Sequence, residues 1–238
     1  VAKNSDDYWV QVNNGVCVVK DTIHINFRQP PIVHLGNDTA LCDKTELLLD
    51  ATAANSIYIW QDHSANDHLN VTGPGQYWVK LNQQGCVSSD TINVFYKQLP
   101  LVWLGNDTTL CENTAILLSA YGANTSFYQW QDNSVTSTLS ANKAGIYTVK
   151  VTGDNGCINA DTIEIKYNAL PVFSLGNDTS LCEGQKLTLQ VTLNAAQYLW
   201  QNGSVSNSFP VDAAGYYWVD VSQHGCSLRD SILVLYKP

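Results

Sequence analysis

The 238-residue chain contains no methionine, and it begins with Val1. We therefore expect a processed or excised piece of a longer protein. No run of about 18 apolar residues occurs, so the sequence predicts no membrane-spanning helix. A basic-then-apolar leader is also absent, and any signal peptide is expected to lie outside this piece.

Positive charge is scarce as well. The chain has 12 Lys and Arg against 21 Asp and Glu, and its net charge is −9. Binding to nucleic acid requires a basic face, so this composition argues against a nucleic-acid partner. Charged residues make up only 14% of the chain. Asn, Thr, Ser and Gln carry much of the polarity instead, as in many extracellular β proteins.

Catalytic signatures are missing too. The chain contains no G-x-S-x-G, H-E-x-x-H or C-x-x-C motif and no phosphate-binding loop. Its histidines share no position in the repeats described next, so we expect surface residues rather than metal ligands. The sequence predicts a protein that is not an enzyme, with no catalytic residue, no metal and no cofactor.

The chain is rich in internal repetition, which usually reflects a repeated structural unit. The motif L-G-N-D-T-x-L-C, here called the opening motif, begins at Leu35, Leu104 and Leu175. A closing block, "YWVKLNQQGCVSSDTINVFY" at 77–96, has copies at 8–27, 147–167 and 217–236. These copies predict three complete repeats, residues 30–98, 99–169 and 170–238. Residues 1–29 are then the C-terminal part of a truncated repeat.

Period-two alternation predicts the fold of each repeat. In 187–191 and 217–221, alternate residues are apolar, and short segments of this kind separated by Gly, Asn and Ser turns are typical of antiparallel sandwiches. A recurrent Gly-x-Tyr lies where an immunoglobulin-like domain carries its tyrosine corner, and a Tyr-x-Trp lies where strand C carries its core Trp. We predict an all-β tandem array of small immunoglobulin-like antiparallel β-sandwiches, each of about seven strands, joined by short linkers.

Each complete repeat also carries two cysteines. A domain of about 70 residues buries little core, so we expect disulfides to stabilise it. Repeat symmetry leaves two sets open, and the favoured one pairs cysteines within a repeat: Cys42–Cys86, Cys111–Cys157 and Cys182–Cys226. The alternative set crosses the links: Cys17–Cys42, Cys86–Cys111 and Cys157–Cys182. Either set implies an oxidising compartment outside the cytoplasm.

The combined pattern of L-G-N-D-T-x-L-C, Y-x-W-Q and G-x-Y-x-V…G-C…D-T-I resembles the tandem immunoglobulin-like or PKD-like repeats of giant Bacteroidota surface proteins. These adhesin-like chains are associated with gliding motility and type IX secretion. The first two complete repeats lack the turn glycine of "EGQKLTL" (183–189). The resemblance implies an extracellular, cell-surface glycoprotein, a stalk segment of an adhesin or filament whose neighbours are further repeats of the same long chain.

Two interpretations of the recurrent Asp-Thr and Asp-Ser pairs are compatible. As structure, they make turns and cap backbone amides. The resemblance also implies O-glycosylation at such pairs, and strand parity directs the Thr or Ser in the closing block outward, while those of the opening motif lie beside an accessible turn. The candidate sites are Thr22, Thr39, Thr91, Thr108, Thr162, Thr179 and Ser231.

Other functions are compatible with the sequence. Asp38, Asp107 and Asp178 recur beside the links, but each link lacks a second recurrent carboxylate for calcium, so we expect solvated turn residues. Trp9 and its counterparts Trp78 and Trp218 follow the strand F Tyr and should face outward. They suggest an array of glycan-binding modules as one alternative, and a spacer of a secreted multidomain enzyme is another. Lateral self-assembly of chains is a further possible interaction.

Overall fold

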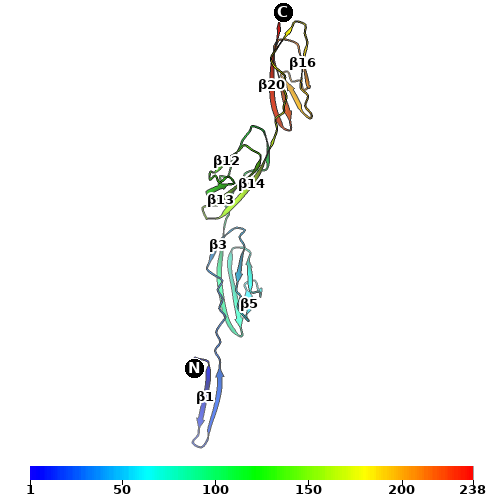
Figure 1. Ribbon diagram of the computed structural model, residues 1–238. Coiled ribbons are helices and arrows are strands. Elements are labelled where there is room, and N and C mark those ends of the chain that lie inside the picture. Colours follow the sequence, from blue (N-terminus) through cyan, green and yellow to red (C-terminus); the bar gives the residue numbers. More distant parts are fainter. Residues whose placement is uncertain (238) are drawn as a thin grey trace. The chain divides into compact units, whose positions relative to one another are not determined.

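The computed structural model describes residues 1–237 and contains twenty β-strands and no helix in that range (Figure 1). The chain divides into two compact units, Val1–Leu99 and Pro100–Pro238. Since the described residues form no helix, none is present that is long and apolar enough to cross a membrane. The architecture is all-β, as predicted.

The first unit begins with a lone hairpin. Strands β1 (Asp6–Asn13) and β2 (Val18–Ile25) form a two-stranded antiparallel sheet. Most of its side chains are exposed, including the apolar Val10 and Val12. The same block of sequence is buried in the complete repeats, so this hairpin lacks the surroundings that its copies have.

The rest of the first unit is a complete sandwich, here called the first sandwich. One sheet has the order β3-β8-β7-β5, and the other pairs β4 with β6. The opening strand β3 runs parallel to β8, and the remaining pairs are antiparallel. The strands are β3 (Thr39–Cys42), β4 (Leu47–Asp50), β5 (Ile57–Trp60), β6 (His68–Val71), β7 (Gly75–Gln83) and β8 (Cys86–Lys97).

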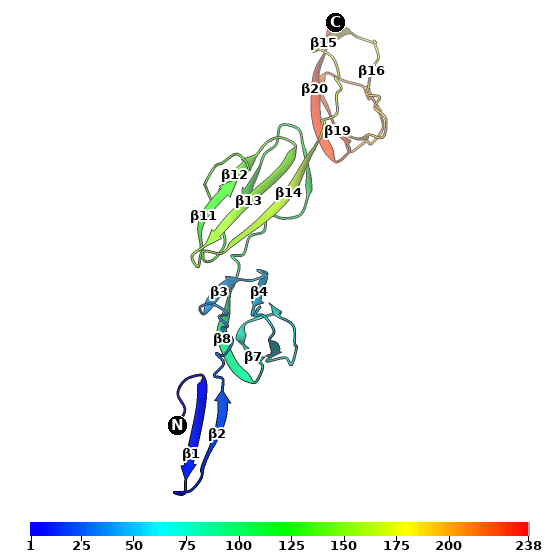
Figure 2. The ribbon, with the colours of Figure 1, turned by 60° about the horizontal axis from the view of Figure 1, so that its bottom comes forward.

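The second unit holds two more sandwiches (Figure 2). Both have the strand order of the first sandwich. The second sandwich has the sheets β11-β13-β14-β9 and β10-β12, and the third has β15-β20-β19-β17 and β16-β18. The strands of the second are β9 (Thr108–Cys111), β10 (Ile116–Ser119), β11 (Thr125–Trp130), β12 (Thr138–Ala141), β13 (Gly145–Gly153) and β14 (Ile158–Asn168). Those of the third are β15 (Thr179–Cys182), β16 (Leu187–Gln190), β17 (Gln197–Trp200), β18 (Ser208–Val211), β19 (Gly215–Gln223) and β20 (Cys226–Lys237).

Each sandwich has its own hydrophobic core around one tryptophan. Trp60, Trp130 and Trp200 are at most 2% exposed. Each indole Nε1 donates a 2.8 Å hydrogen bond to a carbonyl six residues downstream, which satisfies its only polar group. The predicted core role of the Tyr-x-Trp motif is confirmed.

The predicted tyrosine corner is also present. The hydroxyls of Tyr77, Tyr147 and Tyr217 donate to backbone carbonyls four residues upstream, at 2.8 to 2.9 Å. Two details differ from the prediction. Each sandwich has six strands rather than seven, and its opening strand pairs in parallel. Period-two alternation shows which residues face inward, but it carries no information on strand direction.

Candidate functional site

The opening motif is fastened to the last strand of its own sandwich by a carboxylate. Its first residue donates a backbone N–H to the Asp of the Asp-Thr or Asp-Ser pair in the closing block. The three bonds are 2.7 Å long: Leu35 to Asp90, Leu104 to Asp161 and Leu175 to Asp230. Because charge-assisted hydrogen bonds are stronger than neutral ones, the start of the motif is firmly held.

A second carboxylate works in the opposite direction. The Asp within the opening motif accepts a backbone N–H from the last strand at 2.8 Å, in the pairs Asp38–Asn93, Asp107–Glu164 and Asp178–Leu233. We call the two bonds together the aspartate latch. The capping interpretation of the Asp-Thr pairs is thereby confirmed, although they join segments about 55 residues apart rather than local turns.

The latch affects the acidity of its carboxylates. The backbone and side-chain amides of Asn93 donate to Asp38 and lower the pKa of that carboxyl below its usual value. Burial tends to raise the pKa of Asp90, but the N–H groups of Leu35 and Thr91, with His34 nearby, outweigh it and the pKa falls. No group of three or more possible metal ligands occurs within residues 1–237.

The candidate glycosylation sites fall into two classes. The closing-block sites Thr22, Thr91, Thr162 and Ser231 are exposed, as the strand parity predicts. The opening-motif sites were expected to be accessible, but they are only half-exposed: Thr39, Thr108 and Thr179. Each begins a short strand whose third residue, as in Leu41, packs against the core, and the Thr shares that inward parity.

The two cysteines of a repeat lie at opposite ends of the sandwich. In the first sandwich, Cys86 begins β8, whereas Cys42 lies beside Lys97 at the end of the same strand. Eleven residues of extended chain separate those ends by about 36 Å. A disulfide requires Cα atoms less than about 7 Å apart, so the favoured pairing of Cys42 with Cys86 is wrong. The spacing of the cysteines along the chain gave no sign that the opening strand pairs with the far end of the last strand, and this pairing keeps the two cysteines apart.

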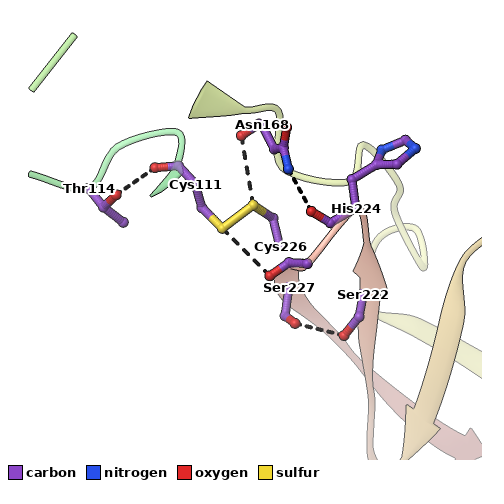
Figure 3. Close-up of a disulfide and its surroundings, with 8 residues drawn as sticks. Cys111, Thr114, Asn168, Ser222, His224, Cys226 and Ser227 are labelled. Atoms are coloured by element: carbon purple, nitrogen blue, oxygen red, sulfur yellow. Dashed lines mark hydrogen bonds between the residues drawn. A yellow bond between two sulfur atoms is a disulfide. The ribbon is translucent and has the colours of Figure 1, made fainter. Parts of the chain in front are cut away.

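The structure instead joins successive sandwiches. A disulfide links Cys111, at the end of β9, to Cys226, at the start of β20, with a Cα–Cα distance of 5.6 Å (Figure 3). This bond rules out both Cys111–Cys157 and Cys182–Cys226 from the favoured set, and Cys86–Cys111 from the alternative. Cys17, Cys86 and Cys182 are free thiols, so Cys17–Cys42 and Cys157–Cys182 are also wrong. Cys42 and Cys157 are disulfide-bonded.

Asn168 organises the surroundings of this disulfide. It is the last residue of β14 and the parallel partner of Cys111. Its side-chain Nδ2 donates to the His224 carbonyl at 2.7 Å, and its own carbonyl lies 3.8 Å from Cys226 Sγ (Figure 3). The other sulfur lies 3.8 Å from the Gly225 carbonyl. Asn168 left no signal in the sequence, because its counterparts after the other closing blocks are the basic residues Arg28, Lys97 and Lys237.

The outward tryptophans are only partly available to a ligand. Trp9 is 59% exposed, whereas Trp78 and Trp218 are half-buried. The Arg229 guanidinium lies 3.7 Å from the ring centroid of Trp218, and Lys20 lies 4.5 Å from that of Trp9. Cation–π contacts of this kind cover one ring face, so a sugar would have to use the other.

No family model and no curated protein matches this chain. Among solved structures, it is similar to extracellular domains 3–5 of Drosophila OTK, at 12% identity over 88% of this chain and 96% of that one, with a TM-score of 0.36. It also resembles the I67–I69 fragment of titin, at 13% identity over 89% and 100%, with a TM-score of 0.32. The insect immune protein hemolin matches at 12% identity over 97% and 82%, with a TM-score of 0.34. The immunoglobulin-like assignment rests on the chain's own strand order, tyrosine corners and core tryptophans.

Proposed function

We propose that this chain is a non-catalytic structural segment of a large secreted protein, a stalk of a cell-surface adhesin or of an extracellular filament. The observation that carries the proposal is the Cys111–Cys226 disulfide, which joins one repeat to the next. A bond of this kind fixes a repeat to its neighbour, as a structural segment requires. It also requires an oxidising compartment.

The repeat boundaries are part of the proposal. Three complete repeats span residues 30–98, 99–169 and 170–238, and residues 1–29 are the C-terminal part of another repeat. The resemblance to Bacteroidota surface proteins supports export by type IX secretion. The exposed Thr22, Thr91, Thr162 and Ser231 are then the acceptors of O-linked sugar, which would shield strand edges from proteases.

The test is to locate the protein in the organism that makes it. Antibodies raised against this chain should label intact cells, and external protease should abolish the label. Deleting the segment should weaken attachment or shorten a surface filament. Label that appears only after permeabilisation would refute the surface role. A catalytic domain in the same gene product, with normal attachment after deletion, would favour the spacer of a secreted enzyme.

Glycan binding is the second candidate, and the exposed face of Trp9 is the observation that favours it. A surface that stacks against sugar rings needs an accessible aromatic ring, and Trp9 offers the largest one in the hairpin. An array of immobilised glycans probed with the intact chain and with Trp9→Ala tests it directly. Equal signals for the two proteins would eliminate Trp9 as a binding residue.

A further inference from the structure

The β1–β2 hairpin has the register of its buried copies but lacks their cover. Tyr8 pairs with Ile23 as Tyr77 pairs with Ile92. Ile23 is 63% exposed, whereas Ile92 is 3% exposed. The other apolar positions behave in the same way: Val10 and Val12 are 58% and 63% exposed, and their counterparts Val79 and Leu81 are fully buried. In each sandwich, the opening half of the same repeat covers the residues that correspond to these exposed positions.

The hairpin also has an open latch. Asp21 aligns with Asp90, Asp161 and Asp230, each of which accepts the N–H of an opening-motif Leu at Oδ2. Asp21 accepts a hydrogen bond at Oδ1 from Thr22 N. Within residues 1–237, its Oδ2 accepts no hydrogen bond. The acceptor atom that receives an opening motif elsewhere is therefore unused here.

The free thiol of Cys86 stands in the same surroundings as the bonded Cys226. Its sulfur lies 3.9 Å from the Arg28 carbonyl, as the sulfur of Cys226 lies 3.8 Å from the Asn168 carbonyl. Arg28 Nη1 donates to the Gln84 carbonyl at 3.3 Å, which reproduces the bond from Asn168 to His224. Arg28 and Asn168 occupy the same place in the repeat, directly after the closing block.

We propose that the hairpin and Cys86 form an acceptor site for the opening half of another repeat of this type, whose cysteine forms a disulfide with Cys86. The T-x-L-C strand would pair in parallel with residues 25–28, as β9 pairs with Ile165–Asn168. That register places its cysteine opposite Arg28 and hence beside Cys86. The site has the same geometry as the existing Cys111–Cys226 junction.

The covalent step balances as an oxidation. Two thiols lose two protons and two electrons and form one S–S bond, and a small-molecule disulfide such as oxidised glutathione is reduced to two thiols. Neither Cys17 nor Cys182 stands beside the Arg28 carbonyl that neighbours Cys86. The acceptor role is therefore specific to Cys86.

The test supplies the missing half from the chain itself. Residues 100–139 are fused directly ahead of Val1, because Val1 aligns with Ser140 in the second repeat. A Thr109→Ala change in the added copy marks its cysteine peptide by mass. The fusion is refolded in a glutathione buffer, and free thiols are counted by alkylation and mass spectrometry.

The parent chain has three free cysteines, Cys17, Cys86 and Cys182. The fusion adds one cysteine, yet we expect the count to fall to two, with the marked peptide linked to Cys86. Hydrogen exchange at Val10 and Ile23 should slow at the same time. A matched fusion whose added cysteine is Ser should protect the hairpin and keep three free thiols.

Two outcomes would overturn the proposal. If the hairpin becomes protected and Cys86 is still alkylated, or the marked cysteine bonds to Cys17, the disulfide assignment is wrong. If neither fusion protects Val10 and Ile23, the hairpin does not accept an opening half. Failure of surface labelling in cells would leave these results unchanged, so this inference and the proposed function fail separately.

Discussion

Tension applied to the second unit should bypass most of its residues. In the full chain, handles attached at Leu101 and Lys237 would pull on the short segments that lead to Cys111 and Cys226. Leu101 is 78% exposed, so a handle there disturbs little packing. The disulfide connects those segments directly, and the sequence between the two cysteines carries no load while the bond holds.

The structure sets the size of the effect. The cysteines are 115 residues apart in sequence, and an extended chain spans at most about 3.5 Å per residue. The disulfide therefore prevents about 400 Å of contour length from extending. The segments outside the bond extend to only about 75 Å in total by the same measure. The oxidised protein should therefore stop extending far short of the reduced one.

Single-molecule force spectroscopy distinguishes the two lengths easily. The oxidised wild type should extend only by the segments outside the bond, about 75 Å in total. Reductant or the Cys226→Ser change should add about 400 Å to the maximum extension. Cys182→Ser is the matched control, because Cys182 is a free thiol and its loss leaves the bridge intact. An oxidised wild type that extends as far as Cys226→Ser would refute the load path and the connectivity on which it depends.

Three other predictions concern the sandwiches themselves. Asp161→Ala removes the latch on Leu104 and should cost the second sandwich about 1–3 kcal/mol in urea unfolding, whereas the exposed Asp154→Ala should cost little. The pKa of Asp90 is lowered by folding, so its contribution to the free energy of unfolding is present above the pKa of the unfolded state and is lost as the pH falls through the pKa of the folded state. Asp90→Asn removes this contribution, so the melting temperature of the variant should fall less steeply than that of the wild type below about pH 4. Trp200→Ala should destabilise the third sandwich by about 3–5 kcal/mol, against under about 0.5 kcal/mol for Trp9→Ala, both measured by denaturant titration.

The fold was predictable because its determinants are local and repeated. Alternation placed Val219 and Val221 in the core, and both are fully buried. The Gly-x-Tyr and Tyr-x-Trp motifs identified Tyr217 and Trp200 correctly, since an aromatic ring with one polar atom needs both a core and a nearby carbonyl. Three copies of each motif made the interpretation firmer than any single copy would have been.

The disulfide was not predictable from spacing, because it depends on which end of a long strand each cysteine reaches. Cys226 begins β20, and Cys182 pairs with the residue at its far end, Lys237. Parallel pairing of the opening strand causes this separation, and alternation gives no sign of strand direction. The pairing that respects it joins the first cysteine of one repeat to the second cysteine of the next.

The repetition of the opening motif follows from these contacts. Its Leu N–H and its Asp carboxylate fasten the segment to the last strand of the same sandwich, as in Leu104 with Asp161 and Asp107 with Glu164. Its Cys, seven residues after the Leu, reaches the end of that strand and bonds the following sandwich. A strand of four residues forms few backbone hydrogen bonds, so the two charge-assisted bonds of the latch help to hold the Cys111 side of the disulfide in place. In the second sandwich the motif thus positions the cysteine that bonds the third, a task that a copy in another sandwich cannot perform.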